Sequence, residues 1–348
     1  MITKHNLQVG NSADLSFIKD NSVNLVVTSP PYPMIDMWDD IFSLMNPNIK
    51  NELESGNGNR AFELMHLELD KIWEELFRVI SPGGIVAINI GDATRTIDKN
   101  FQIYMNGSRI ITKMIDLGFY ALPRIIWQKT TNSPNKFMGS GMLPGGAYVT
   151  LEHEHILIFR KGRKKEYNNK ERINRQNSAY FWEERNVWFS DIWNIKGERQ
   201  KSLLGENRER TAAYPLELPL RIINMYSNYG DVVLDPFFGT GTTSIAAMIL
   251  NRNSIGVDID PSFIDTFEKR IDGIKQISSN YIENRIKNHK LFIDERQGNL
   301  KYVAENLNLA VMTKQEENII FYTIETCSKK DDKFFETTYK KYNADYLL

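Results

Sequence analysis

The sequence predicts an α/β fold in which helices cover both faces of a mostly parallel, seven-stranded sheet, the arrangement called doubly wound. Apolar runs without polar alternation occur at residues 23–27, 85–90 and 231–234, as in strands buried on both faces of a parallel sheet. A long amphipathic segment at 61–80 separates the first two runs, as a crossover helix would. The third run opens a β-α-β unit whose first turn is rich in glycine.

The first half of the chain is expected to supply most of the sheet. We predict strands at 5–9, 23–27, 85–90, 122–128 and 155–159, and helices at 13–19, 61–80 and 108–117. In the longest of these helices, apolar side chains recur every three or four residues. A Ser-Pro-Gly-Gly turn at 81–84 is expected to end that helix, and Gly118 the next one.

The second half is predicted to complete the sheet. A helix is expected at 214–226, with Pro215 tolerated in its first turn. A strand at 231–234, a helix at 244–250 and a strand at 254–257 follow. Residues 274–348 form a polar extension in which no motif is found.

A proline-rich loop, Thr28-Ser29-Pro30-Pro31-Tyr32-Pro33, follows the second predicted strand. Each proline fixes φ and removes an N–H, so the carbonyl oxygens of Ser29 and Pro30 lack the usual local donors. They are then available as acceptors beside the aromatic face of Tyr32. This arrangement suits a flat ring that carries an amine, although a turn after a strand explains the loop equally well when it is taken alone.

The glycine-rich turn spans residues 235–243 and leads into the next helix. Asp258 ends the following strand, where a carboxylate can accept hydrogen bonds from a ribose diol. The turn holds only two glycines, Gly239 and Gly241, and Asp235 would repel a pyrophosphate. No Gly-Lys-Ser/Thr follows, which disfavours a phosphate-binding loop. The pattern therefore predicts an adenosine-bearing ligand with a cationic linker.

The segment at 160–210 is locally basic, with 14 Lys/Arg against 8 Asp/Glu. Such cations can neutralise phosphates, and interleaved aromatic rings can stack on bases. The aromatic residues are Tyr167, Tyr180, Phe181, Trp182, Trp188, Phe189 and Trp193. A small subdomain with its own aromatic core and a solvated charged face would have the same composition.

Composition limits the other classes of function. A net charge of -1 over 348 residues argues against a wholly basic nucleic-acid binder. The chain lacks an apolar run of the ~20 residues that a membrane span needs and a signal-like N-terminus, and its single cysteine, Cys327, suits a reducing compartment. We therefore expect a cytoplasmic protein that does not associate with membranes. The His-Glu-His sequence at 153–155 has no further ligand cluster to support it, so we expect no metal site.

The proline-rich loop and the glycine-rich turn together resemble the catalytic and cofactor motifs of S-adenosylmethionine-dependent DNA amino-methyltransferases. The catalytic motif comes first, with a basic segment between the two motifs, as in the β group of that family. The resemblance covers about residues 5–270 and implies a Rossmann-like methyltransferase fold with a target-recognition insertion. Two positions depart from the family pattern: Gly10-Asn11 replaces Gly-Asp, and Tyr214-Pro215 replaces His-Pro.

The resemblance also implies roles for individual residues. A methyl group would pass from S-adenosyl-L-methionine to the exocyclic amine of a base extruded from double-stranded DNA. The catalytic residues would be Ser29, Pro30, Pro31 and Tyr32, with Tyr32 stacked on the base. The cofactor would be bound by Asn11, Ser12, Tyr214, Asp235, Phe237, Gly239, Gly241, Thr242 and Asp258. DNA would be bound by Arg163, Lys164, Lys165, Lys170, Arg172 and Arg175.

The target base follows only from Ser29, the first residue of the Ser-Pro-Pro-Tyr motif. In the family, serine at the position of Ser29 mostly accompanies N4-cytosine modification, and aspartate or asparagine accompanies N6-adenine modification. We therefore expect N4-cytosine, with N6-adenine as the alternative. C5-cytosine methylation needs an attacking thiolate, and Cys327 lies in the polar extension. Methylation of RNA or of a protein amide, and non-catalytic binding of nucleic acid, remain further alternatives.

The predicted organisation has four parts. Residues 1–161 would form the catalytic half, 162–205 the target-recognition region, 206–273 the cofactor-binding half, and 274–348 an extension. The expected partner is double-stranded DNA, with a cognate restriction endonuclease as a second candidate. Both a monomer and a homodimer are compatible with the sequence.

Overall fold

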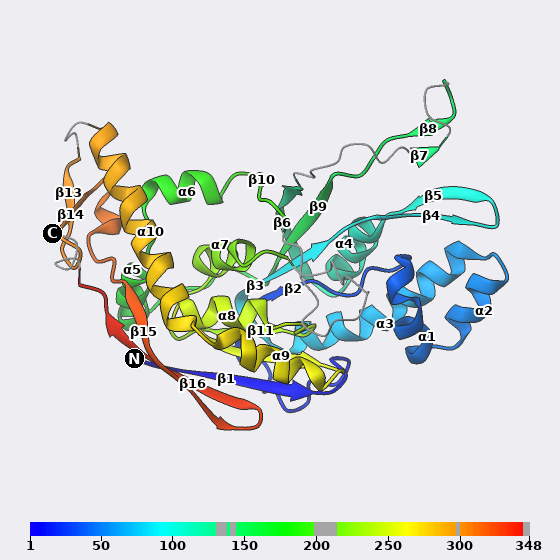
Figure 1. The fold of residues 1–348 in the computed structure, drawn as a ribbon, viewed down its shortest axis with the longest axis horizontal. Coiled ribbons are helices and arrows are strands. Elements are labelled where there is room, and N and C mark those ends of the chain that lie inside the picture. The colour runs from blue at the N-terminus through cyan, green and yellow to red at the C-terminus, as the bar shows by residue number, and fades with distance from the viewer. Residues whose placement is uncertain (130–137, 140–143, 198–213, 297–299, 344–348) are drawn as a thin grey trace.

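A ten-stranded sheet organises the computed structural model, which describes residues 1–129, 138–139, 144–197, 214–296 and 300–343 (Figure 1). The strands lie in the order β10-β6-β9-β3-β2-β11-β12-β1-β16-β15. Their bounds are β1 Ile2–Val9, β2 Val23–Thr28, β3 Ile80–Ile90, β6 Phe119–Gln128, β9 His153–Lys161, β10 Ile192–Asn194, β11 Val232–Asp235, β12 Asn253–Asp258, β15 Tyr322–Asp331 and β16 Phe334–Lys341.

The seven predicted strands are all present and are consecutive in the sheet, from β6 to β1. The neighbours β3, β2, β11, β12 and β1 are parallel, so their carboxyl ends meet at one edge. Strand β9 is antiparallel to both β3 and β6. The α/β prediction is therefore confirmed, with three further strands at the edges of the sheet.

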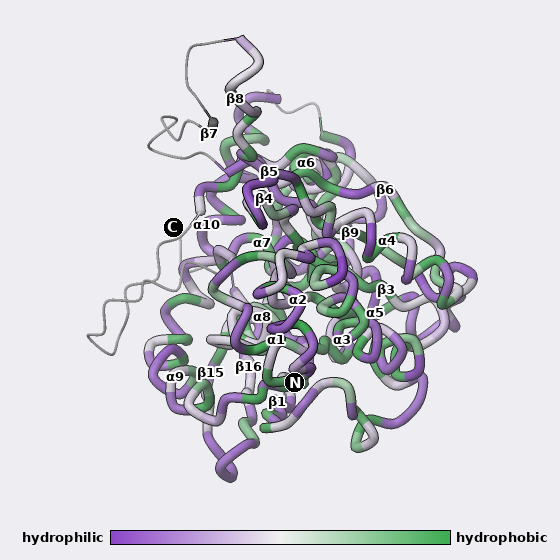
Figure 2. Tube along the Cα trace, turned by 90° about the vertical axis from the view of Figure 1, so that its right-hand side faces the viewer, coloured by the Kyte–Doolittle hydropathy of each residue, from purple (hydrophilic) through white to green (hydrophobic). Residues whose placement is uncertain are grey.

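Two hydrophobic cores cover the two faces of the sheet, because successive side chains of a strand point to opposite faces. Leu25 and Val27 contribute to one core, and Val26 lies in the other. The first core includes residues of α7 Glu217–Tyr226, α8 Thr242–Ile249 and α9 Ser262–Ile271, and the second those of α3 Gly58–Val79 and α4 Asn106–Asp116. In Figure 2 the hydrophobic colour gathers toward the middle of the molecule.

The C-terminal extension continues the sheet. Strand β16 pairs antiparallel with β1, and β15 pairs with β16. Helix α10, Ile274–Glu295, crosses over β15 and α8 (Figure 1). The short hairpin of β13 Tyr302–Ala304 and β14 Leu309–Val311 packs with α10 and with Phe181 in a third core.

Additional elements follow the parallel strands at the same edge. The segment after β2 contains a 3-10 turn, Asp36–Trp38, and the helices α1 Asp39–Met45 and α2 Asn48–Glu54. A hairpin of β4 Ala93–Ile97 and β5 Asn100–Tyr104 follows β3, and the short strands β7 Met138–Gly139 and β8 Ala147–Tyr148 lie between β6 and β9.

The basic segment contains α5 Asn169–Asn177 and α6 Trp182–Trp188.

The helix predicted at 13–19 is wrong. Side chains satisfy the backbone groups that a helix would have paired: the Asn11 side-chain oxygen accepts from the Ala13 N–H at 2.9 Å, and Asp14 accepts from the Ser16 N–H at 3.0 Å. Arg78 donates to the carbonyls of Leu15 and Ile18. Such local hydrogen bonds compete with helix formation, and here they hold a series of turns.

The turn predicted at 81–84 is also wrong. These residues belong to β3, which starts at Ile80 and has a shift in its register against β2. Gly83 has a φ of +81°, which accommodates this irregularity. Among the described residues, no helix is both long and apolar enough to cross a lipid bilayer.

Candidate active site

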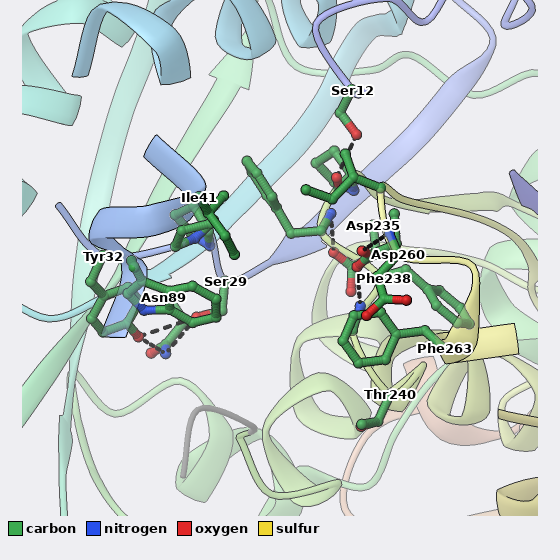
Figure 3. Close-up of a pocket in the computed structure, with 18 of the residues that line it drawn as sticks. Ser12, Ser29, Tyr32, Ile41, Asn89, Asp235, Phe238, Thr240, Asp260 and Phe263 are labelled. Atoms are coloured by element: carbon green, nitrogen blue, oxygen red, sulfur yellow. Dashed lines mark hydrogen bonds between the residues drawn. The ribbon is translucent and has the colours of Figure 1, made fainter. Parts of the chain in front are cut away.

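A pocket lies at the edge where the parallel strands end. The loops after β1, β2, β11 and β12 line it, together with the ends of β3 and β6 and the start of β9. Figure 3 shows two groups of side chains in it, one around Ser29, Tyr32 and Asn89 and another around Asp235 and Phe238. The carboxyl edge of a parallel sheet is where ligands bind in such folds.

The first group is joined by hydrogen bonds. The Ser29 hydroxyl lies 3.1 Å from the Tyr32 hydroxyl, which donates to Glu154 Oε2 at 2.9 Å. The Asn89 amide donates to the same carboxylate oxygen at 2.7 Å and to Tyr32 at 2.8 Å. Lys129 pairs with the other oxygen of Glu154. This half of the pocket therefore presents a serine hydroxyl held by an ordered polar network.

Tyr32 acts only as a neutral phenol in this network. Burial, and then the negative charge of Glu154, raise the pKa of Tyr32 well above its usual value. The phenol consequently keeps its hydrogen and donates it to the carboxylate. The Lys129 ammonium also lies 4.7 Å from the centre of the Trp127 ring, where a cation is attracted to the ring face.

A buried amide holds the loop that carries Ser29. Asn106, the first residue of α4, donates to the carbonyls of Pro33 at 3.1 Å and Gly91 at 3.0 Å. Its side-chain oxygen lies 3.0 Å from Nε2 of His66. Burial lowers the pKa of His66 to about 4, so this ring is neutral and donates to Asn106. The Asn106 side chain therefore connects the loop after β2 with the loop after β3 through hydrogen bonds.

Asp235 is the centre of the second group. Its carboxylate accepts from Thr28 at 2.6 Å, from Thr243 at 2.7 Å and from the Phe237 N–H at 3.1 Å. Tyr214 lies 3.4 Å from the same carboxylate. Burial nevertheless raises the pKa of Asp235 to about 7, against the effect of these donors. Because Thr28 precedes Ser29, Asp235 also links the two halves of the pocket.

The remaining walls combine acids with aromatic rings. Asp258 accepts from the Gly239 N–H at 2.9 Å and from the Asp260 N–H at 3.0 Å. The apolar surface beside these acids comes from Pro236, Phe237, Phe238, Ile259 and Phe263. An adenine ring can pack on such a surface, and buried acids favour a positively charged ligand over a phosphate. The residues present thus fit S-adenosyl-L-methionine.

All the predicted catalytic and cofactor residues except Gly241 line this pocket. Gly241 has a φ of +77° and is the N-cap residue that precedes α8. A Cβ atom there would come within 2.4 Å of Phe267 and 2.7 Å of Phe238. Gly241 is therefore needed for the turn and its packing, and it does not line the pocket.

The sequence pattern predicts no site role for the polar partners Asn89, Lys129 and Glu154, although Trp127-Gln128-Lys129 is part of the family resemblance. Glu154 is singled out only as the centre of a His-Glu-His sequence that lacks further metal ligands. Within the described residues, no group of three or more His, Cys, Asp or Glu could hold a metal ion. Trp38, Met37 and Ile41, from the segment before and within α1, also line the pocket.

The predicted DNA-binding residues lie at the far end of the strands from the pocket, where the parallel strands begin. Because β9 is antiparallel, His153 starts it at the pocket edge and Lys161 ends it where β2 and β3 begin. Its nine residues span about 26 Å at ~3.3 Å each. The backbone of Lys165 lies next to Gly83, and Asn174 of α5 donates to the Tyr229 carbonyl at 2.8 Å, just before β11.

This location counts against contact with DNA that enters the pocket, and the DNA-binding role of these residues stays a prediction. Part of the predicted target-recognition region, 198–205, lies outside the described residues. The described chain before that part, after β10, is at the pocket edge: the Ile195 carbonyl accepts from the Trp127 indole at 2.8 Å.

Comparisons with known proteins agree with this geometry. A family model of N6/N4 type, described as DNA methylase, matches residues 23–269. The chain is 51% identical to the type II methyltransferase M.MthZI of Methanothermobacter thermautotrophicus, over 99% of this chain and 97% of that protein. It is 48% identical to the type II methyltransferase M.MjaI of Methanocaldococcus jannaschii, over 79% of this chain and 93% of that protein.

A solved structure extends the similarity to a cofactor complex. The putative DNA modification methylase from Thermus thermophilus, complexed with S-adenosyl-L-methionine, superposes with a TM-score of 0.60 at 31% identity. The match covers 78% of this chain and 95% of that one.

Proposed function

Because the chain belongs to the N6/N4 family of DNA methylases, we propose that it methylates the N4 amine of a cytosine in double-stranded DNA. S-adenosyl-L-methionine supplies the electrophilic methyl group, carried on a positively charged sulfur. The observation that carries the choice of base is Ser29, which heads the catalytic loop and lines the pocket. In the family that this loop resembles, serine mostly accompanies N4-cytosine.

The chain's own residues account for binding of the cofactor. Asp258 is positioned to accept from a ribose diol, and the rings of Phe237 and Phe238 can enclose an adenine. The carboxylate of Asp235 favours positive charge in the buried centre of the pocket. These assignments extend the roles that the sequence predicted for this half of the pocket.

The catalytic loop can make a poorly nucleophilic amine more reactive. The lone pair of an exocyclic amine is delocalised into the ring, so the nitrogen attacks poorly. An acceptor at Ser29 Oγ binds an N–H of that amine and stabilises the more tetrahedral nitrogen of the transition state. The base has to leave the duplex to reach this position, since its amine cannot otherwise approach the methyl group in line.

The test is the identity of the methylated nucleoside. The protein is incubated with unmethylated plasmid DNA and isotopically labelled S-adenosyl-L-methionine, and the DNA is then digested and analysed by mass spectrometry. We expect labelled N4-methylcytosine as the product. Labelled N6-methyladenine alone would overturn the choice of base, and absence of label from DNA, with label on RNA or protein, would overturn the proposed substrate. Ser29→Ala controls for a contaminating methylase.

A further inference from the structure

We propose that Glu154 is the end of a proton relay, Ser29–Tyr32–Glu154, that fixes Ser29 as an acceptor for the target amine and takes up the proton released after methyl transfer. This inference rests on the proposed function, because it concerns the amine bound at Ser29. It assigns a task to a carboxylate that belongs to neither sequence motif. Glu154 acts through Tyr32 and is therefore a positioning residue and the final proton acceptor.

The direction of the hydrogen bonds follows from the number of hydrogens. Tyr32 has one hydroxyl hydrogen, and Glu154 Oε2, at 2.9 Å, can only accept it. The Tyr32 oxygen is then an acceptor for its other two neighbours, the Asn89 amide at 2.8 Å and the Ser29 hydroxyl at 3.1 Å. Ser29 must point its hydrogen at Tyr32. The Asn89 amide also approaches Ser29 Oγ, at 3.5 Å, and the remaining lone pair is left for the amine.

In this orientation the Ser29 hydroxyl accepts a hydrogen bond from the pocket, so it favours a ligand that donates one. If Glu154 were absent, the Tyr32 hydrogen could turn toward Ser29 and Ser29 could point its own hydrogen into the pocket. The serine would then meet the amine as donor against donor. The carboxylate, held by Lys129 and Asn89, excludes that alternative.

The same chain balances the chemistry. The amine nitrogen uses its lone pair to form the new N–C bond, and the C–S electron pair returns to sulfur, so the positive charge moves to nitrogen. Ser29 Oγ then accepts an N–H proton, Ser29 passes its own hydrogen to Tyr32, and Tyr32 passes its hydrogen to Glu154 Oε2. The methylated amine and the carboxylic acid are both neutral, and the two hydroxyls are restored. No further co-reactant is needed.

Other groups around Glu154 are accounted for. Lys129 faces it from the end of β6, and Tyr32 and Asn89 face it from the ends of β2 and β3. On its own strand, His153 and His155 flank it, with Asp92 lying 3.9 Å from His155 and Arg124 of β6 also near that ring. All of these groups are kept when Glu154 alone is changed.

The experiment is a double-mutant cycle with Glu154→Gln and Tyr32→Phe. Single-turnover methyl transfer is measured on unmethylated plasmid DNA with saturating S-adenosyl-L-methionine. Each variant is expected to lose about 10²-fold in rate, because Ser29 is no longer held as an acceptor; this is the low end for loss of one hydrogen bond that stabilises a transition state. Because both break the same chain, the double variant is expected to be no slower than either single variant. Glu152→Gln, an exposed neighbour two residues away, is the matched control and keeps the wild-type rate.

Two readouts separate the relay from a structural role. Calorimetry is expected to give unchanged affinities for S-adenosyl-L-methionine and DNA in all variants. Glu154→Asp, which keeps a carboxylate, is expected to recover part of the rate that Glu154→Gln loses, whereas a purely structural role of the side chain predicts no such difference. Additive losses in the cycle, or a Glu154→Asp that is as slow as Glu154→Gln, would overturn the relay.

The proposed function fails in a different way. If the wild type itself transfers no methyl to DNA, the substrate is wrong. If the wild type is active and Glu154→Gln is equally active, only the relay is wrong. If Glu154→Gln does not fold, judged by its melting curve, Tyr32→Phe and Glu154→Asp decide: the relay then requires a slow Tyr32→Phe and a Glu154→Asp that is faster than Tyr32→Phe.

Discussion

At the scale of single residues, Asp235 combines full burial with several donors, and this makes cofactor binding depend on pH. Burial raises its pKa to about 7, above the usual value of 3.8, so the free protein carries a proton there below neutrality. A cationic cofactor favours the carboxylate and expels that proton. Affinity for S-adenosyl-L-methionine is therefore expected to fall about tenfold per pH unit below 7 and to level off above it.

The measurement is calorimetry from pH 5.5 to 8.5 in buffers of different ionisation enthalpy, which also counts the released proton. Asp235→Asn, which keeps the shape but not the charge, is expected to bind weakly with no such slope. The same titration makes the unfolding free energy of the free protein depend on pH. The raised pKa means that the folded state binds the extra proton, so stability falls as pH rises from about 4 to about 7. An unchanged slope in Asp235→Asn would assign the titration to another group.

At the scale of elements, the start of α4 determines how the catalytic loop is held. Asn106→Ala leaves the carbonyls of Pro33 and Gly91 and the N–H of His66 buried without their partner. The expected loss of unfolding free energy is about 2 kcal/mol or more, since each orphaned group costs roughly 1–3 kcal/mol. Methyl transfer is expected to slow while cofactor affinity is kept, because Asn106 lies outside the cofactor half of the pocket.

Denaturant unfolding and single-turnover rates check this prediction. Asn59→Ala is the matched control, since this exposed amide of α3 bonds to the half-buried side chain of Gln102 at 2.9 Å. It is expected to change stability by less than about 0.5 kcal/mol. Equal losses in the two variants would mean that the buried amide has no special part in holding the loop.

The strands could be predicted from the sequence, whereas some turns and short helices could not. The strands were predictable because continuous apolar runs buried on both faces leave few alternatives. The turns at 13–19 were not, because they depend on Arg78 and Glu75 of a distant helix, which bond to the backbone there. The helices α1 and α2 were missed because their segment shows no sustained apolar period.

At the scale of the whole molecule, the direction of one strand decides which surfaces can act together. The two motifs were predictable as one site because both follow parallel strands, whose carboxyl ends share an edge. Glu154 and Lys129 join that site only because β9 starts, and β6 ends, at the same edge. Strand direction is a property of pairing across the sheet, so a pattern read along the chain does not reveal it. The same reversal carries residues 163–175, which follow β9, away from the pocket.

Charge reversal at the two edges tests this arrangement. Lys196, exposed just after β10, is at the pocket edge, and Lys164, also exposed, is at the far edge. If DNA lies over the pocket, Lys196→Glu weakens binding and makes the slope of log affinity against log salt shallower by about 0.9, the value for one phosphate contact. Lys164→Glu is expected to leave both unchanged.

Fluorescence anisotropy with labelled duplex DNA at several salt concentrations measures both quantities for the matched pair of variants. Each variant carries the same change in net charge, so a long-range effect of charge alone would alter the two equally. Only a local contact with the phosphate backbone separates them. A shallower slope in Lys164→Glu, with Lys196→Glu unaffected, would return DNA binding to the 163–175 segment and would require the duplex to reach around the sheet from the pocket.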